Sequence, residues 1–193
     1  MKDKLILALV GMPGAGKSEA ASYLEKKGIP FVRFGKITEE EVLKMKLPLT
    51  QTNERLAREK IRREEGMGVY AQRAKPKIKE LLEKNNILTI DGLYSWEEFL
   101  ILKKEFPSLL LIHIFAEPEI RYERLTKRSV RSLPIDEGFS RDAAELEKLN
   151  KGGPIALADY LIENDSEEIS ELYKKVDKLM LRLGVNYPKV ESQ

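Results

Sequence analysis

One short segment of the chain combines residue types that suit the binding of a polyphosphate. It matches the pattern G-x-x-x-x-G-K-[ST] and consists of Gly11, Met12, Pro13, Gly14, Ala15, Gly16, Lys17 and Ser18. Glycines let successive backbone N–H groups point at one anion, Lys17 can neutralise phosphate oxygens, and the Ser18 hydroxyl is a natural ligand for Mg²⁺. A turn that only packs well is the alternative, but the apolar run before the segment and the helical pattern after it favour a phosphate site. We predict that this phosphate-binding loop (P-loop), with Glu19 on the following helix, binds ATP and Mg²⁺.

A carboxylate stands at the end of a later apolar run. Residues 87–90 are apolar or β-branched, and Asp91 and Gly92 follow them. An enzyme with a P-loop needs an acid at such a strand end, to hold the water shell of the metal or a substrate hydroxyl. An Asp-Gly pair is equally suited to a plain turn. We predict that Asp91 is catalytic and orients, through water, the Mg²⁺ bound at Ser18.

Three arginines share one face of the helix expected after the fourth strand. Arg121, Arg124 and Arg128 are spaced i, i+3 and i+7, which places them on the same side of a helix. Such a stripe suits a polyphosphate, because each guanidinium can bind two oxygens. The alternative is a solvated helix whose arginines pair with the glutamates at 117, 119 and 123. We predict catalytic roles for Arg124 and Arg128, beside Lys17 and Asp91.

Two further polar segments could approach a bound substrate. Residues 129–150 could form a lid that closes over the phosphates with Arg131 and Arg141, or an ordinary surface excursion. In the segment 35–85, Arg58 and Arg62 follow Arg55 at helical spacing and could grip an acceptor phosphate, while Tyr70 could stack on a base. The alternative for this segment is a solvated helix face, balanced by neighbouring glutamates.

The elements that must position these residues alternate along the chain. Apolar runs at 4–10, 30–34, 87–91, 109–115 and 159–162 alternate with charged segments of helical period, which predicts an α/β fold with a parallel sheet. Helix-start signals stand at Thr38, Ser95 and Pro118. Pro76 predicts a kink, or two helices, within 67–84.

Composition excludes several classes of protein. Lys and Arg number 34 against 32 Asp and Glu, giving a net charge of +2, so a general basic field for nucleic acid is not expected. The chain has no cysteine and one histidine, His113, which argues against thiolate or histidine-rich metal centres. Its apolar runs are far shorter than the about 20 residues that span a bilayer. We expect a cytoplasmic protein that acts on a nucleotide and a small molecule, without nucleic-acid or membrane partners; the oligomeric state stays open.

These motifs together resemble the nucleoside monophosphate kinase branch of the P-loop kinases. Residues 91–95 are similar to the Asp-Gly-Phe-Pro-Arg segment of adenylate kinases, although Tyr94 and Ser95 stand at the end of that segment. Residues 123–128 are similar to the start of the adenylate kinase lid; the likeness implies that Arg124 lies against the adenine and that Arg128 reaches phosphate. Residues 158–165 are similar to the last strand of dephospho-coenzyme A kinases, which implies that Asn164 lies near the donor base.

Over essentially its full length, the chain resembles an archaeal family of adenylate-kinase-related P-loop proteins. The resemblance implies a three-layer fold with a five-stranded parallel sheet of order 2-3-1-4-5 and helices on both faces. It implies one domain over 1–184, acceptor-binding helices within 35–85, a lid at 129–150 and a tail at 185–193. The implied activity is transfer of the γ-phosphoryl group of ATP to a nucleotide-like acceptor such as AMP. The alternatives are a dephospho-coenzyme A type of kinase acting on a hydroxyl, and a nucleotide-binding regulator or slow NTPase without an acceptor.

Overall fold

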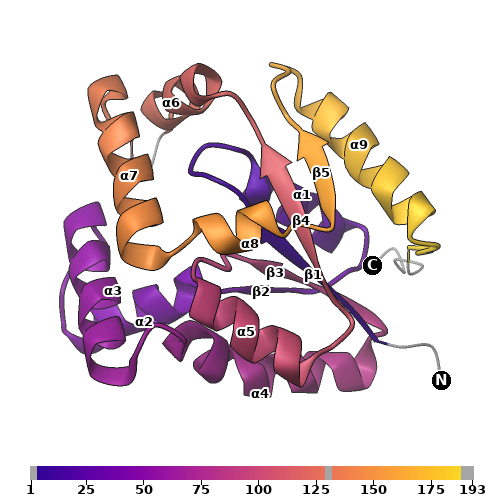
Figure 1. The fold of residues 1–193 in the computed structure, drawn as a ribbon, viewed down its shortest axis with the longest axis horizontal. Helices are drawn as coiled ribbons and strands as arrows, with labels where there is room; N and C mark the ends of the chain where they lie inside the picture. Colours follow the sequence, from indigo (N-terminus) through magenta and orange to yellow (C-terminus); the bar gives the residue numbers. More distant parts are fainter. Residues whose placement is uncertain (1–3, 129–131, 188–193) are drawn as a thin grey trace.

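A parallel sheet forms the centre of the protein (Figure 1). The computed structural model describes residues 4–128 and 132–187. Its five strands run in the order β2-β3-β1-β4-β5, and every neighbouring pair is parallel. The strands are β1 (Leu5–Val10), β2 (Phe31–Arg33), β3 (Ile87–Asp91), β4 (Leu109–Phe115) and β5 (Tyr160–Glu163). The predicted fold class and strand order are confirmed, and the predicted strands agree with the observed ones to within about a residue.

Helices cover both faces of this sheet (Figure 1). They are α1 (Lys17–Lys26), α2 (Gly35–Lys44), α3 (Gln51–Glu65), α4 (Val69–Lys84), α5 (Trp96–Glu105), α6 (Pro118–Thr126), the 3₁₀ turn η1 (Ile135–Glu137), α7 (Gly138–Leu149), α8 (Gly152–Ala156) and α9 (Ile169–Arg182). Alternate residues of β1 enter two separate hydrophobic clusters. Ile6 and Ala8 pack with α4 and α5, whereas Leu7 and Leu9 pack with α1 and α9. Parallel strands buried on both faces are expected to be apolar throughout, as these are.

The parallel arrangement brings the functional segments to one edge of the sheet. The P-loop follows β1 directly, Asp91 ends β3, and α6 follows β4. Leu9 of β1 lies in register with Asp91 of β3, and Val10 lies in register with His113 of β4. Ligands of open α/β sheets bind at this carboxyl edge of the strands. The topology therefore places the candidate residues of three loops around one position.

Two of the three helix-start signals mark helix starts in the structure. Ser95 and Glu98 form the expected capping box at the start of α5, and Pro118 is the first residue of α6. Thr38 does not cap a helix, because α2 already begins at Gly35. Its hydroxyl instead lies 2.8 Å from the hydroxyl of Tyr70, inside the protein.

Two other predictions need correction. The segment around Pro76 is a single helix, α4, so of the two alternatives, a kink or two helices, the second is excluded and the kink stays a prediction. Proline has no backbone N–H, so the carbonyl of Gln72, four residues before Pro76, loses its helical donor. Both residues are exposed, so water can donate a hydrogen bond to that carbonyl. The tail does not begin at 185, because Val185 and Tyr187 pack against the cluster of α1 and α9.

Within the described residues 4–128 and 132–187, each helix is too short or too polar to cross a membrane.

Candidate active site

The P-loop is held in shape by its glycines and by side chains from other elements. Gly11 and Gly16 have φ angles of 138° and 100°, which other residues rarely adopt. A Cβ on Gly11 would collide with the carbonyl of Ile114, and one on Gly16 would collide with the amide of Asn164. That amide donates to the carbonyl of Ala15 at 2.9 Å. The loop therefore needs glycine both for its backbone angles and for close packing.

Lys17 and Ser18 stand at the start of α1 and point to different partners. The Lys17 ammonium donates to the carbonyl of Met12 at 2.9 Å, back across the loop. Burial, and next the charge of Lys151, lower the pKa of Lys17 to about 7; Asp91 and Glu145 act in the opposite direction. The Ser18 hydroxyl donates to Asp91 Oδ2 at 2.9 Å. This contact is direct, and both residues offer the oxygen atoms that Mg²⁺ prefers. The predicted action of Asp91 on the Mg²⁺ at Ser18 through water stays a prediction.

Arg121 is not part of a phosphate-facing stripe. Its side chain is 6% exposed and forms a bidentate ion pair with Asp142 of α7, with distances of 3.0 and 2.6 Å. The guanidinium also donates to the carbonyl of Pro13 at 3.1 Å and to that of Ala116 at 3.0 Å. The idea of three arginines presented together to phosphate is therefore wrong. Arg121 instead connects the P-loop to α6 and α7, a role that helical spacing alone does not reveal.

The other arginines of α6 and the following loop have separate surroundings. Arg124 donates to the carbonyls of Asn164 and Ser166, both at 2.7 Å, so it fixes the loop after β5. Its predicted position against adenine, and that of Asn164 near the base, stay predictions. Arg128 lies close enough to Lys17 to contribute to the lowering of its pKa. Arg131 lies outside the described residues.

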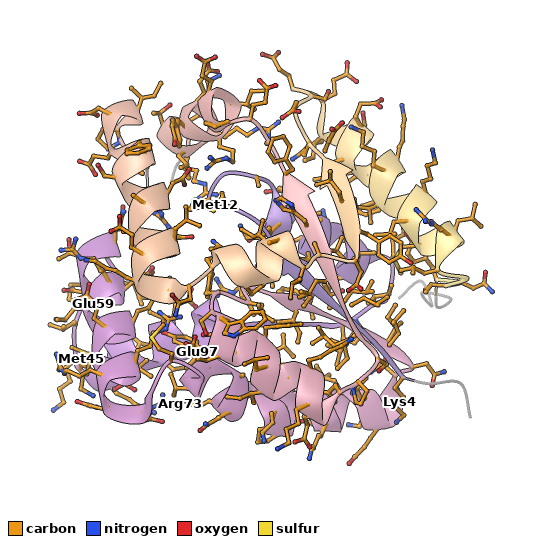
Figure 2. The ribbon with its side chains drawn as sticks, in the orientation of Figure 1. Lys4, Met12, Met45, Glu59, Arg73 and Glu97 are labelled. Carbon is orange, nitrogen blue, oxygen red and sulfur yellow. The ribbon has the colours of Figure 1, made fainter. Side chains whose placement is uncertain are left out.

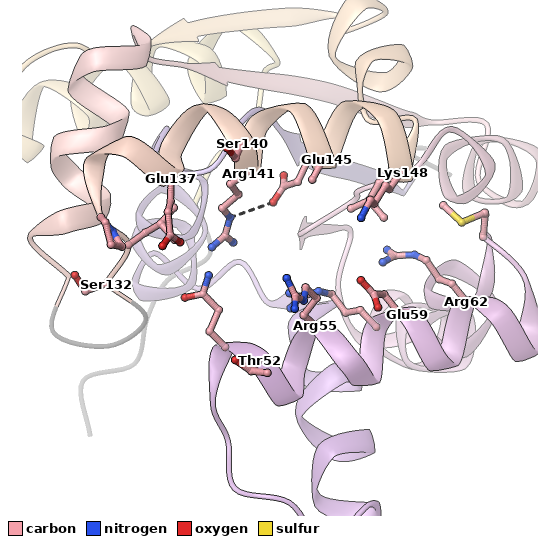
Figure 3. Close-up of a pocket in the computed structure, with 17 residues that line it drawn as sticks. Thr52, Arg55, Glu59, Arg62, Ser132, Glu137, Ser140, Arg141, Glu145 and Lys148 are labelled. Carbon is pink, nitrogen blue, oxygen red and sulfur yellow. Dashed lines mark ion pairs between the residues drawn. The ribbon is translucent and has the colours of Figure 1, made fainter.

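A cavity of about 730 Å³ lies between α3 and α7. Figure 3 shows Thr52, Arg55, Glu59 and Arg62 on one side, and Ser140, Arg141, Glu145 and Lys148 on the other. Figure 2 labels Met12 of the P-loop and Glu59 of α3, with α7 between them in that view. Helix α3 of the segment 35–85 thus forms one wall, and α7, in the C-terminal part of the predicted lid segment, forms the other. The acceptor-binding and lid roles of these segments stay predictions.

Arg58 is the predicted acceptor residue whose surroundings best suit an anion. It lines the cavity and has Glu54 as a neighbour on the helix at 3.6 Å. Burial lowers the pKa of Arg58, and the nearby Arg141 on the opposite wall lowers it further. An anion between these two guanidiniums would relieve their repulsion.

The other two predicted acceptor residues, Arg62 and Tyr70, are both buried. Tyr70 is fully buried, so its ring cannot stack on a bound base, and the prediction is wrong. The Arg62 side chain is 6% exposed, lies 4.6 Å above the Tyr70 ring centre and pairs with buried Glu98 at 3.2 Å. Glu98 also accepts from the backbone N–H groups of Tyr94 and Ser95. Arg62 therefore joins α3 to the start of α5 and also lines the cavity, and its predicted role in binding an acceptor phosphate stays a prediction.

The site also contains two residues, Glu145 and Lys151, that the sequence patterns did not indicate. Glu145 of α7 lines the cavity, forms an ion pair with Lys151, and lies 3.5 Å from Arg141. Burial acts to raise the pKa of Glu145, but the charges of Lys151 and Arg141 outweigh it and lower that pKa to about 2. In the sequence, the one signal near Lys151 is the pair of glycines that follows it. Gly153 of this pair packs directly on the Trp96 ring, so the pair marks a closely packed segment.

The comparisons with known proteins agree with this geometry. Residues 7–141 match a protein-family model described as an AAA domain. A UPF0200 protein of Thermococcus sibiricus is 36% identical over 185 residues, which cover 94% of this chain and 96% of that relative. The chain belongs to the UPF0200 family. A UPF0200 protein of Pyrococcus horikoshii is 32% identical over 188 residues, covering 95% and 100% of the two chains. The expected archaeal P-loop family is thereby confirmed.

Solved structures with the same fold include small-molecule kinases. Shikimate kinase of Bacteroides thetaiotaomicron superposes on the UPF0200 chain with a TM-score of 0.62 at 17% identity, covering 94% of this chain and 99% of the kinase. A gluconokinase of Sinorhizobium meliloti gives a TM-score of 0.52 at 15% identity, covering 95% and 98%. At this level of identity the likeness shows the fold, which is that of P-loop kinases.

Proposed function

We propose that the protein is a kinase that transfers the γ-phosphoryl group of ATP to a small anionic acceptor held between α3 and α7. The observation that carries the proposal is the common wall of the two sites. Glu145 lines the cavity, and its charge acts on Lys17 of the P-loop. An acceptor in the cavity would therefore lie beside the terminal phosphate of a nucleotide on the P-loop, which is the arrangement that phosphoryl transfer requires.

The residues around the P-loop suit the divalent cation that such donors carry. The Ser18 hydroxyl and the Asp91 carboxylate are hard oxygen ligands, held 2.9 Å apart. Mg²⁺ bound there would neutralise charge on the phosphates. Lys17 would neutralise the β- and γ-phosphate oxygens, and Asp91 would orient water around Ser18. Arg128 and Arg141 would add positive charge near the transferring group, where transition-state charge is spread over equatorial oxygens.

The acceptor site favours an anion without requiring a stacked base. Arg58 and Arg141 approach the cavity from opposite walls, and Tyr70 is too deeply buried to stack on a base there. A nucleoside monophosphate such as AMP is the first candidate. A hydroxyl-bearing acceptor of the dephospho-coenzyme A type is the second. It is favoured by the segment after Asp91, where the N–H groups of Tyr94 and Ser95 are used to bind Glu98 and no arginine is supplied.

The test is an incubation of the protein with ATP, Mg²⁺ and single acceptors, followed by phosphorus NMR. The acceptors are the nucleoside monophosphates, dephospho-coenzyme A and shikimate, the last because a shikimate complex is among the related folds. We expect ADP to form only in the presence of one acceptor, and Lys17→Met to lose the activity. Lys26→Met, on the exposed far end of α1, is the matched control. ADP formed without an acceptor, or with none of the panel, would point to a slow NTPase or a nucleotide-binding regulator.

The acceptor site has its own test once an acceptor is found. Arg58→Met should raise the KM for the acceptor by about tenfold to a hundredfold, as expected for loss of a charge-assisted hydrogen bond. The KM for ATP should change little. An equal rise in both KM values would argue that Arg58 maintains the fold of the site and does not bind the acceptor.

A further inference from the structure

A buried lysine outside the P-loop lies beside the candidate nucleotide site. The side chain of Lys151, between α7 and α8, is only 1% exposed and forms an ion pair with Glu145. Its ammonium also lies 5.2 Å from the centre of the Tyr94 ring. Lysine is almost never fully buried unless it is paired, so the position of Lys151 is set by specific contacts.

Tyr94 connects Lys151 to the metal-binding end of the P-loop. A Cβ built on Gly92 would lie 2.8 Å from the Tyr94 hydroxyl, so this hydroxyl packs directly on Gly92. The neighbouring residue Asp91 accepts the hydrogen bond from Ser18. Lys151 therefore lies on the Asp91 side of the P-loop, where the terminal phosphate of a nucleotide would meet the acceptor cavity. The lowering of the Lys17 pKa by Lys151 agrees with this placement.

The charges around Lys151 suit the binding of a further anion better than they suit a purely structural ion pair. Glu145 is shared between Lys151 and Arg141, and Lys17 is a third cation close to the same carboxylate. A buried ion pair is a weak source of stability, because desolvation offsets its attraction. Gathering further cations around one carboxylate adds repulsion, which a bound polyphosphate would relieve.

We propose that Lys151 binds the γ-phosphate of the nucleotide together with Lys17, and that Glu145 positions its ammonium for this contact. The ammonium has three donors, so it can keep one hydrogen bond to Glu145 while it donates to a phosphate oxygen. The inference rests on the proposed nucleotide site. It adds a binding residue from the segment between α7 and α8, which the sequence motif does not include.

The test compares the affinity for ADP with that for the β,γ-imido analogue of ATP, both with Mg²⁺, by isothermal titration calorimetry. Lys151→Gln should weaken binding of the triphosphate analogue by about tenfold to a hundredfold, because one charge-assisted hydrogen bond is lost. ADP affinity should stay within about twofold, and Lys151→Arg should restore most of the loss. Lys174→Gln breaks an exposed lysine–glutamate pair on α9 and serves as the matched control.

A double variant separates phosphate binding from a structural role. Lys151→Gln with Glu145→Gln removes the buried pair as a whole, so no carboxylate is left uncompensated. We expect this variant to retain the selective loss for the triphosphate. Normal affinity for the analogue, or an equal loss for both ligands, would overturn the inference.

The same experiment distinguishes this inference from the proposed kinase activity. A wild-type protein that binds neither nucleotide would overturn both. A selective loss in the Lys151 variants, combined with no phosphorylated acceptor in the panel, would overturn the kinase activity alone and support the assignment of Lys151.

Discussion

The ion pair between Arg121 and Asp142 gives the sharpest test of how the site is held together. Arg121→Met keeps the aliphatic part of the side chain but removes every contact of the guanidinium. Asp142, whose side chain is only 11% exposed, then loses its cationic partner. Its carboxylate still accepts a hydrogen bond from the Tyr122 hydroxyl, 3.1 Å away. The carbonyls of Pro13 and Ala116 also lose their partner. We expect the free energy of unfolding to fall by about 3–5 kcal/mol, the usual cost of breaking a buried pair by removing one partner.

This loss is large enough to measure by calorimetry and by chemical denaturation. For a chain of this size, each kcal/mol lowers Tm by about 2–4 °C, so Tm should fall by about 6–20 °C. Lys174→Met, which breaks an exposed pair, should change stability by less than about 0.5 kcal/mol. Because Arg121 also contacts the P-loop carbonyl of Pro13, we expect nucleotide affinity to fall in the same variant.

A double-mutant cycle decides whether the pairing itself is responsible. Arg121→Met with Asp142→Leu leaves no uncompensated charge, and it should be more stable than Arg121→Met alone. A loss below about 1 kcal/mol for Arg121→Met, or strictly additive effects of the two substitutions, would refute the reasoning. In that case Arg121 would resemble an ordinary surface arginine, despite its burial.

Four further predictions follow from the contacts of three single residues. The pKa of Lys17 is lowered to about 7, and a bound phosphate favours the protonated form of this lysine. Nucleotide affinity should therefore fall by up to about tenfold per pH unit above 7. Titration calorimetry from pH 6 to 9 should show this slope in the wild type and not in Lys17→Met. The stability of the ligand-free protein should move the opposite way, rising relative to Lys17→Met as pH increases through 7, because folding favours the neutral amine. Ser95→Ala removes both the cap of α5 and the hydrogen bond to the carbonyl of Met67, and should cost about 1–2 kcal/mol in denaturation. Tyr70→Phe leaves the buried hydroxyl of Thr38 without its partner and should cost about 1–3 kcal/mol in denaturation; an unchanged free energy of unfolding would argue against a contribution from this hydrogen bond.

The sheet and the P-loop could be predicted because their signals are local. Each strand is a continuous apolar run, and parallel strands buried on both faces require such runs. The P-loop pattern combines backbone freedom at Gly11 and Gly16 with a lysine and a hydroxyl at fixed spacing. Asp91 could be predicted for a similar reason, since it ends the strand next to β1 and the topology brings it to Ser18.

The cationic residues could not be sorted in the same way, because their roles depend on contacts between distant segments. Helical spacing grouped Arg121 with Arg124, but the burial of Arg121 follows from the packing of α7 on α6, which supplies Asp142 from 21 residues away. Arg62 likewise pairs with Glu98, 36 residues later in the chain, although it also lines the cavity. In a chain where one residue in three is charged, a stripe of arginines on a helix is therefore weak evidence for a ligand.

The partners of each cation provide the information that spacing lacks. Arg121 pairs with a carboxylate through two nitrogens and donates to two backbone carbonyls, and Arg124 donates to two carbonyls. Arg121 makes four hydrogen bonds within the protein, so an arriving phosphate would have to displace existing bonds. Arg124 makes two, both to the loop after β5. Lys151 and Arg141 instead share one carboxylate, Glu145, beside Lys17. Cations that share one counterion beside the candidate nucleotide site are the ones for which a polyphosphate adds most. The distinction between structural and ligand-binding cations in this fold thus depends on how many acceptors each has, and the Arg121 and Lys151 variants test its two sides independently.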